Sequence, residues 1–558
     1  MATINTFSLI TLPLLLLFTV QLSCAAAADP PPTNQTSPAA LCKFTPDPAY
    51  CRSLLPNRNS NVYDCARFSV RRSISQSRKF LDLVNDYLTR RSSLTLSAIR
   101  ALEDCKFLAE LNFDFLSSSF QTVNTTSKTL SSIKADDIQT LLSAIITNEQ
   151  TCLESLQSEA ASLENGLSSP LFNDTKLYSV SLAFFTKGWV PRTRTWKHRG
   201  NNLPGFANGR LPLKMSRKTL EVYQSVSRRK LLQAGESGVL VSDIVTVNQN
   251  GTGDFVTIND AIAAAPNKSS GANGYFMIYV TTGVYEEYVN IAKNKRYLMM
   301  VGDGINQTII TGNRSVADGW TTFNSATFIV TGPNFVAVNI TVRNTAGAIK
   351  HQAVALRSGA DLSTFYSCSF EAYQDTLYTH SLRQFYRECD IYGTVDFIFG
   401  NAAVILQNCN IYPRLPMSGQ FNAITAQGRT DPNQNTGTSI HNCVIRASDD
   451  LATSGSTVKT FLGRPWKEYS RTVYMQNFMD DLIDSAGWQK WNGDFALSSL
   501  YYAEYNNTGP GSDTSNRVTW DGYHVIDAID AANFTVSNFL LGDAWLPLAG
   551  IPFSGSLI

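Results

Sequence analysis

The chain has 558 residues, of which 43% are hydrophobic, 11% aromatic and 16% charged, and its formal net charge is +1. This composition excludes an intrinsically disordered chain, and the length predicts two or three globular units. The balanced total hides an uneven distribution of charge along the chain.

Residues 1–27 are predicted to form a cleaved signal peptide. Their apolar run from Phe7 to Val20 is short for a membrane span, and the small residues of "CAAAAD" suit signal peptidase, which leaves a membrane anchor as the weaker alternative. Ten glycosylation acceptors of the type Asn-x-Ser/Thr follow, at Asn34, Asn124, Asn173, Asn250, Asn267, Asn306, Asn313, Asn339, Asn506 and Asn533. Together these features predict a secreted, extracellular glycoprotein.

Residues 38–190 are predicted to form an all-α bundle. Apolar side chains recur at spacings of three, four and seven within 70–88, 96–108 and 138–156. Such spacings place each set on one face of a helix, so we expect a small up-and-down bundle.

The cysteines of this region predict two disulfides. Cys42 and Cys51 lie close together before the helical stretches, whereas Cys105 and Cys152 fall on the inward faces of two helices. An oxidising compartment would let both pairs form, Cys42–Cys51 and Cys105–Cys152, and this leaves Cys65 unpaired.

Residues 191–233 are predicted to be a basic, exposed linker. Between Lys176 and Lys230 the chain has 13 Lys and Arg and one acidic residue, with Pro, Gly and Asn scattered among them. The segment ends in "SRRKLLQ", where Arg228, Arg229 and Lys230 form a cluster that invites a processing protease. A solvated run of charge is the alternative interpretation.

The part of the chain from Ala234 onward is acidic. It holds 19 basic and 28 acidic side chains, a net charge of −9. Because phosphate contacts need a basic surface, we expect this part to bind no nucleic acid.

Residues 242–555 change to short β-rich segments that form a faint internal repeat. Asn or Cys recurs at one position of the repeat, with steps of 21 and 20 residues between Cys368, Cys389 and Cys409. Asn339 and Cys443 occupy similar positions in neighbouring segments. Repeats of this length predict a solenoid in which each repeat forms one turn of a parallel β-helix.

Two aspartates share one phase of this repeat. Asp375 follows Cys368 by seven residues, and Asp396 follows Cys389 by seven residues. Since stacked strands are about 4.8 Å apart, the two carboxyl groups should lie within a few ångströms of each other. Gln374 and Gln352 are 22 residues apart and extend this polar row by one turn. The alternative is that these residues only form turns.

Such a row can carry out acid–base chemistry. Two close carboxylates do not both ionise easily, so one becomes an acid while the other stays an anionic nucleophile or base. The two Gln amides could stabilise an oxyanion. In "FLGRPW", Arg464 could hold the ionised carboxylate and Trp466 could pack against a sugar ring.

The sequence lacks the motifs that are typical of serine hydrolases, paired cysteines and metal sites. The chain has no Gly-x-Ser-x-Gly motif, no Cys-x-x-Cys pair and no metal-ligand spacing among its five His residues. His351 and His380 flank the polar row, and we expect hydrogen-bonded structural roles for them. Two interpretations of this pair stay open beside others: a glycoside hydrolase with paired Asp, and a non-enzymatic inhibitor or wall-binding protein.

Six motifs resemble those of plant pectinesterases, the pectin methylesterases: "GVYEE", "NTAGAIKHQAVALR", "YQDTLY", "GTVDFIFGNA", "ITAQGRTD" and "LGRPW". Residues 38–190 are similar to the pectinesterase-inhibitor four-helix bundle. The resemblance implies an all-β, right-handed parallel β-helix that follows an all-α prodomain. It also implies an aspartyl esterase that removes methyl groups from cell-wall homogalacturonan, with no metal or organic cofactor.

Roles for single residues follow from this resemblance. It implies that Asp396 is the nucleophile, that Asp375 is the general acid and later the base, and that Gln374 stabilises the oxyanion with Gln352 as its partner. Substrate contacts are implied for Thr322, Arg464 and Trp466, and a disulfide for Cys389–Cys409.

The resemblance also implies partners and a location. "RRKLL" is similar to a site for a subtilisin-like processing protease, so the bundle is expected to restrain the enzyme until it is cut. Methyl-esterified homogalacturonan is the expected substrate, and a proteinaceous pectinesterase inhibitor is a further expected partner. We expect a monomer in the cell wall.

Overall fold

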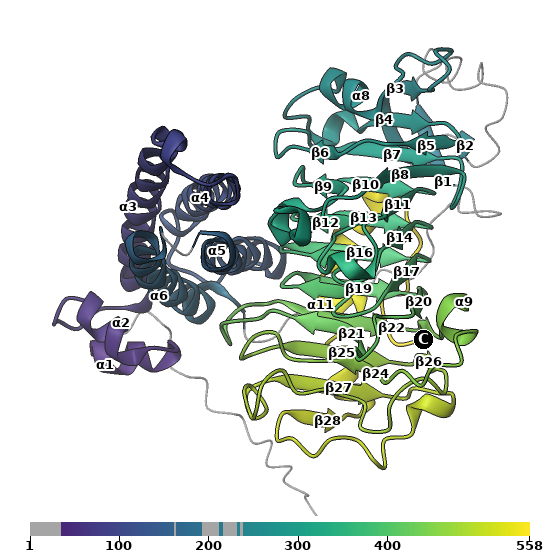
Figure 1. Cartoon of the computed structure of the whole chain (residues 1–558). Helices are drawn as coiled ribbons and strands as arrows, with labels where there is room; N and C mark the ends of the chain where they lie inside the picture. Colours follow the sequence, from purple (N-terminus) through teal and green to yellow (C-terminus); the bar gives the residue numbers. More distant parts are fainter. Residues whose placement is uncertain (1–34, 161–162, 192–210, 216–231, 235–237) are drawn as a thin grey trace, which may run out of the picture.

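The computed structural model describes residues 35–160, 163–191, 211–215, 232–234 and 238–558. A helical domain packs against one side of a tall stack of parallel strands (Figure 1). The predicted signal peptide and the predicted processing site, Arg228 to Lys230, lie outside the described residues. Among the described helices, none has the length and apolar character needed to cross a membrane.

The helical domain is a four-helix bundle, as predicted. Two short helices, α1 (Pro38–Leu41) and α2 (Pro48–Leu54), precede the four long ones, which are α3 (Val62–Thr89), α4 (Leu96–Val123), α5 (Ser132–Glu159) and α6 (Glu164–Trp189). The side chains of Asn61, Thr95 and Ser131 cap the first turns of α3, α4 and α5 by accepting backbone N–H groups. These caps fix the residues at which the helices begin.

Both disulfides predicted for the bundle are present. Cys42–Cys51 joins the two short segments before α3, and its Cα atoms are 5.6 Å apart. Cys105–Cys152 joins α4 to α5 with a Cα separation of 4.7 Å. Cys65 is a buried free thiol.

The second domain is a parallel β-helix with three sheets. The 13-stranded sheet has the order β2 (Leu232–Ala234), β1 (Leu211–Met215), β3 (Val239–Val247), β4 (Tyr275–Val280), β7 (Leu298–Gly302), β10 (Val336–Val338), β13 (Ser363–Tyr366), β16 (Arg383–Arg387), β19 (Ala403–Gln407), β22 (Gly437–His441), β25 (Arg471–Met475), β27 (Tyr501–Tyr505) and β28 (Tyr523–Val525). The eight-stranded sheet has the order β26 (Phe478–Met479), β23 (Val444–Ile445), β20 (Asn410–Pro413), β17 (Asp390–Gly393), β14 (Ser369–Glu371), β11 (Thr341–Asn344), β8 (Thr308–Gly312) and β5 (Gly283–Tyr285). The seven-stranded sheet has the order β24 (Thr460–Gly463), β21 (Asn422–Gln427), β18 (Ile398–Gly400), β15 (Leu377–Thr379), β12 (Leu356–Ser358), β9 (Phe328–Val330) and β6 (Val289–Ile291).

The predicted linker differs from expectation, because it contributes two of these strands. β1 pairs in parallel with β3, and β2 pairs with β1, so both extend the edge of the 13-stranded sheet. Additional strands of this kind cover the hydrogen-bonding groups of an otherwise open edge.

The repeat predicted from Asn and Cys corresponds to a turn between two sheets. Asn339, Ser367, Glu388, Asn408 and Asn442 all have φ between 52° and 59°, the left-handed conformation that turns the chain. The next residue of each turn points into the core, and this gives a buried stack of Ile340, Cys368, Cys389, Cys409 and Cys443. Asn339 therefore belongs one position before the cysteines.

The predicted Cys389–Cys409 disulfide is wrong. Both residues are buried free thiols, and the amide of Cys389 donates to the sulfur of Cys409 over 3.5 Å. Equivalent residues of neighbouring parallel rungs project side by side, whereas a disulfide needs side chains that turn toward each other. Burial raises the pKa of the Cys389 thiol well above its usual range.

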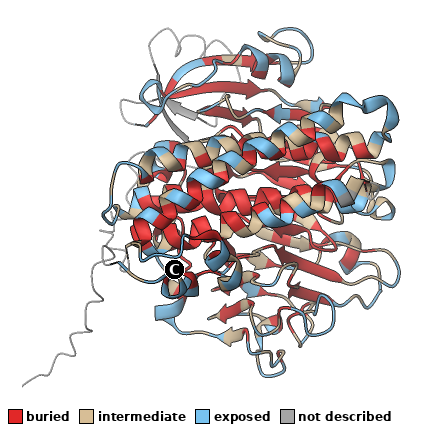
Figure 2. Ribbon diagram, turned by 90° about the vertical axis from the view of Figure 1, so that its left-hand side faces the viewer, coloured by how far each residue is buried: buried red, intermediate tan, exposed pale blue. Residues whose placement is uncertain are grey.

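Apolar packing also joins the two domains. One buried cluster contains Leu102, Leu108 and Leu156 of the bundle together with Phe323, Tyr378 and Phe399 of the β-helix. Figure 2 shows the long helices in front of the strands, with buried residues along both layers. The bundle therefore covers the outer face of the seven-stranded sheet.

Candidate active site

A cavity of about 390 Å³ lies between the seven-stranded sheet and helix α5. All seven residues for which the sequence predicts catalysis or substrate binding line it: Thr322, Gln352, Gln374, Asp375, Asp396, Arg464 and Trp466. The chain separates them by up to 144 residues, from 322 to 466, and the solenoid brings them to one place.

The register of the seven-stranded sheet aligns the two aspartates. Leu377 of β15 pairs with Ile398 of β18, and Asp375 and Asp396 each lie two residues before these partners. The Asp375 amide donates to the carbonyl of Val395 over 3.1 Å. Both aspartates have a left-handed φ, 63° and 52°, which is uncommon for residues other than glycine and recurs at functional sites.

Arg464 holds one of the two carboxylates. Its Nε and Nη2 atoms donate to the two oxygens of Asp396 over 2.8 and 2.7 Å. This bidentate pair is charge-assisted and fixes the plane of the carboxylate. Arg464 follows directly after β24, and its guanidinium lies 4.3 and 5.3 Å from the ring centroids of Trp491 and Phe421.

The two aspartates differ in proton affinity. Burial raises the pKa of Asp375 well above its usual range, and the negative charge of Asp396 raises it further. Burial also raises the pKa of Asp396, but the hydrogen bonds and charge of Arg464 oppose that rise. These surroundings favour a proton on Asp375 and a negative charge on Asp396.

The two glutamines complete the polar end of the cavity. Ala353 donates its amide to the carbonyl of Gln374 over 3.2 Å, which ties the segment of Gln352 to the rung of Asp375. Both amide side chains are half-buried and line the cavity together with Thr322. Their N–H groups can thus face a ligand bound beside Asp396.

Aromatic residues form the floor, and sequence reasoning missed most of them. Tyr378 and Phe399 are paired in register, and their rings stack with centroids 4.1 Å apart. Trp466 meets the ring of Phe399 edge to face at 5.9 Å. Each of Tyr378 and Phe399 follows a site aspartate by three residues. The same 21-residue phase that aligned the aspartates could therefore have predicted this pair.

Helix α5 forms the opposite wall of the cavity. Thr151, Glu154, Ser155 and Ser158 line it from the bundle side. Thr151 Oγ1 is 3.0 Å from His380 Nε2, and Glu154 forms an ion pair with Lys467, which follows Trp466. Burial lowers the pKa of His380 well below its usual range, so this imidazole is neutral and has a structural role.

A buried charge cluster anchors α5 beside the cavity. Arg383 binds Asp136 and Asp137 of the bundle over 3.1 and 2.9 Å, and it binds Asp361 of its own domain over 2.7 Å. The Arg383 side chain is only 5% exposed. Since a buried cation is costly without partners, separating the domains would remove two of its three ion pairs.

The described part of the chain contains no cluster of three or more His, Cys, Asp or Glu that could hold a metal. The cavity lining presents paired carboxylates, the guanidinium of Arg464, amide donors and aromatic rings.

Two neighbouring carboxylates in an aromatic-floored cleft of a parallel β-helix are groups suited to acid–base hydrolysis. The sequence model of the family described as Pectinesterase matches residues 244–543, and that of the family described as Plant invertase/pectin methylesterase inhibitor matches residues 36–184. The chain belongs to the pectinesterase family and is an esterase.

Related proteins match nearly the whole chain. It is 67% identical over 532 residues to "Probable pectinesterase/pectinesterase inhibitor 20" of Arabidopsis thaliana, covering 94% of each chain. It is 46% identical over 520 residues to "Pectinesterase 2" of Citrus sinensis, covering 92% of this chain and 94% of the relative. Among solved structures, "Pectin methylesterase from Carrot" is 54% identical with a TM-score of 0.55, and the match covers 56% of this chain and 98% of that one.

Proposed function

We propose that the β-helix domain hydrolyses the methyl esters of homogalacturonan through Asp396 and Asp375. The observation that carries this proposal is the bidentate contact of Arg464 with Asp396, one rung from a buried Asp375 whose pKa is raised by burial. The family and the carrot structure support pectin methylesterase activity, and the cavity supports the roles of the residues.

The first half of the reaction forms a covalent intermediate. The Asp396 carboxylate attacks the ester carbonyl carbon, and the amides of Gln374 and Gln352 donate to the oxygen that becomes negative. The carbonyl carbon then releases its methoxy oxygen, which takes the proton of Asp375 and leaves as methanol. The galacturonate acyl group is now joined to Asp396 as an anhydride, and Asp375 is ionised.

The second half uses water. Asp375 accepts a proton from a water molecule, whose oxygen attacks the galacturonate carbonyl carbon of the anhydride. The bond to Asp396 breaks, and this restores the Asp396 carboxylate and the Asp375 acid. The product is a free galacturonic acid unit, which then loses its proton to solvent.

Product analysis tests this function against its nearest alternative. Homogalacturonan of high methyl content is incubated with the protein, and methanol and new reducing ends are measured in the same sample. An esterase releases methanol without new reducing ends. New reducing ends in proportion to time, with the methyl content unchanged, would instead support a glycoside hydrolase.

We further propose that the bundle restrains the enzyme in the uncut chain. Thr151 and Ser155 of α5 line the cavity that contains both aspartates, so a polysaccharide chain cannot pass through it while α5 is docked. The buried contacts of Arg383 with Asp136 and Asp137 hold α5 there. A subtilisin-like protease that cuts at Arg228 to Lys230 would release the restraint.

Methanol release by the intact chain and by the same chain after cleavage at the basic segment tests the restraint. We expect the cut protein to be at least about tenfold faster. Removing both anchoring charges, Asp136→Asn with Asp137→Asn, should activate the uncut chain. Asp114→Asn is the matched control, because Asp114 pairs with Lys293 at an exposed rim, and it should change little. Equal rates for cut and uncut wild-type protein would contradict the restraint.

The same proposal predicts where the enzyme acts and which other protein binds its cleft. Homogalacturonan is a cell-wall polymer, so the enzyme would act outside the cell after secretion. We also expect a separate proteinaceous inhibitor to bind at the cleft and therefore to compete with the docked bundle.

A further inference from the structure

The 13-stranded sheet contains strands from both sides of the predicted processing site. β1 (Leu211–Met215) precedes the basic cluster Arg228 to Lys230 in the sequence, and β2 (Leu232–Ala234) follows it. A cut anywhere in this cluster divides the chain into a bundle fragment, which ends with β1 and the residues after it, and a β-helix fragment, which begins with β2 and β3. One sheet therefore joins the two fragments.

β1 lies between two strands of the β-helix fragment. Residues 213–215 pair in parallel with residues 239–241 of β3, and residues 211–213 pair in parallel with residues 232–234 of β2. Leu213 belongs to both sets of pairs. Since only the four residues 235–238 separate β2 from β3 in the sequence, one short stretch of the β-helix fragment borders both edges of β1.

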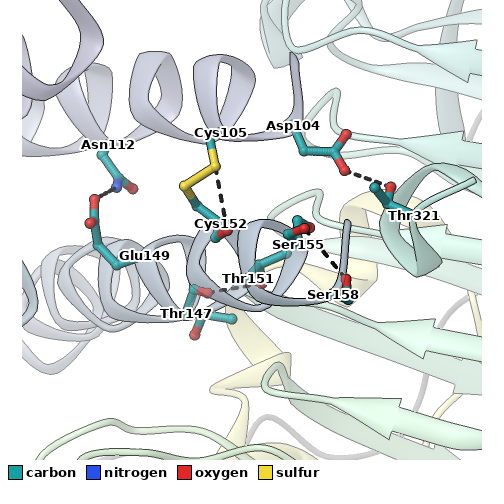
Figure 3. Close-up of a disulfide and its surroundings, with 10 residues drawn as sticks. All are labelled: Asp104, Cys105, Asn112, Thr147, Glu149, Thr151, Cys152, Ser155, Ser158 and Thr321. Carbon is teal, nitrogen blue, oxygen red and sulfur yellow. Dashed lines mark hydrogen bonds between the residues drawn. A yellow bond between two sulfur atoms is a disulfide. The ribbon is translucent and has the colours of Figure 1, made fainter. Parts of the chain in front are cut away.

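The docked bundle attaches the same fragment at a second place. Asp104 of α4 accepts a hydrogen bond from Thr321 Oγ1 over 2.6 Å (Figure 3), and the apolar cluster between the domains includes Tyr378 and Phe399 of the seven-stranded sheet. β1 belongs to a different sheet, and Figure 1 shows it on the side of the β-helix that faces away from the bundle. The bundle fragment is thus attached at two separate places.

A cut in the basic cluster breaks neither attachment. The chain runs from α6 through residues 192–210 to β1 before it reaches the cluster, so the covalent path from the bundle to β1 stays intact after the cut. A bundle that leaves the cleft is still attached to the β-helix through β1. Two linked contacts bind more tightly than either contact alone, because the second one forms at a high effective concentration.

We propose that β1 is a noncovalent clasp that keeps the bundle fragment on the β-helix fragment after the cut. This inference rests on the proposed function, because it gives the proposed restraint a second attachment. The edge of β3 accepts a strand of this chain through backbone hydrogen bonds, as in other cases of strand addition. The cut then permits activation, and the departure of β1 completes it. The tenfold gain expected after cleavage is accordingly reached at high dilution, where the fragments separate.

Dilution of the cut protein tests the clasp. The full chain is cut at the basic cluster, equilibrated at a series of concentrations and passed through a native size-exclusion column. We expect the fragments to elute together at the highest concentrations and separately after dilution. Methanol release per mole of β-helix fragment should rise over the same range of dilution, by about tenfold in total.

Two proline substitutions in β1 should open the clasp. Proline has no N–H group, and successive residues of a strand direct their N–H groups to opposite sides, so Leu213→Pro with Lys214→Pro removes one donor toward each edge. We expect the dissociation constant of the cut fragments to rise at least about tenfold. Both positions lie in the bundle fragment, so the β-helix fragment is identical to that of wild-type protein. The uncut variant should stay as slow as uncut wild-type protein, because the chain still joins its domains.

The matched control places two prolines just beyond the strand. Arg217→Pro with Lys218→Pro makes the same kind of change after the end of β1 at Met215. The cut fragments of this variant should separate at the same concentrations as those of wild-type protein. Melting curves of the uncut proteins verify that all variants are folded.

The outcomes distinguish the clasp from the restraint. If the cut fragments of wild-type protein separate as readily as those of Leu213→Pro with Lys214→Pro, or if the control variant separates equally readily, the clasp is refuted. A gain in methanol release on cutting that does not depend on dilution would also refute the clasp, while the restraint stands. If the fragments stay together through β1 but their separation leaves methanol release unchanged, the clasp stands and the restraint falls.

Discussion

Arg464 binds both carboxylate oxygens of Asp396, whereas it reaches Asp375 only through its charge. This difference separates two aspartates that occupy the same position on neighbouring rungs. In the proposed reaction Asp396 is the fixed anion and Asp375 the proton donor, although their backbone conformation and register are alike.

Replacing the fixed anion should abolish the reaction. In Asp396→Asn the side chain keeps its size, but the amide is a poor nucleophile and leaves Arg464 without its counter-ion. We expect methanol release by the cut chain to fall at least about 10³-fold, in line with the loss of a nucleophile. Unchanged hydrolysis by this variant, in protein that melts like wild type, would exclude Asp396 as the nucleophile.

Arg464→Lys should change the pH dependence as well as the rate. A lysine cannot make the bidentate contact, so the pKa of Asp396 should rise further. Since Asp396 must be ionised to attack, the acid limb of the pH profile should move to higher pH. We expect a loss of about 10² in kcat for the cut chain, and a lower rate with an unmoved acid limb would refute the electrostatic role of Arg464.

The alignment of Asp375 with Asp396 is predictable from the sequence, because their separation of 21 residues equals one rung of the solenoid. The grouping of Arg464 with Asp396 also follows from a motif. The contact of Arg383 with Asp136 does not, because these residues are 247 positions apart and in different domains. Periodicity describes one element or one repeat, and it contains no information about which faces of two domains meet.

The cysteine pairs show the same limit of prediction from sequence spacing. Cys105 and Cys152 lie on inward faces of neighbouring helices, and the pattern predicts their disulfide correctly. Cys389 and Cys409 are equivalent residues of neighbouring rungs, and their proximity is predictable although their parallel orientation is not. A spacing therefore predicts neighbours, while a bond needs the directions of the side chains.

Acid should strengthen the restraint by the bundle. An exposed Asp has a pKa of about 3.9, and burial raises the pKa of Asp104 in the docked bundle to about 7. The docked state therefore holds this proton more tightly, so the contribution of Asp104 to docking is largest at low pH and is lost as pH rises from about 4 to 7.

The rate of methanol release by the uncut chain, divided by the rate of the cut chain at the same pH, measures this effect. The division removes the pH dependence of the reaction itself. We expect the ratio to rise across that window, by less than tenfold per pH unit. Asp104→Asn removes the titrating group, so its ratio should be flatter. An equally steep ratio for Asp104→Asn would show that another group controls docking.

The disulfide of α4 and α5 should control the restraint more strongly than the other disulfide. Cys105 follows Asp104, and Cys152 follows Thr151, so this bond joins the two helices at the residues that contact the β-helix domain (Figure 3). Cys105→Ser with Cys152→Ser opens a loop of 47 residues, and we expect the bundle to lose about 2–4 kcal/mol of stability. The uncut variant should release methanol faster than uncut wild-type protein. Cys42→Ser with Cys51→Ser is the matched control, because that bond closes a loop of nine residues away from the cavity. If both double variants activate the uncut chain equally, general loosening of the bundle, and not the position of Cys105–Cys152, sets the restraint.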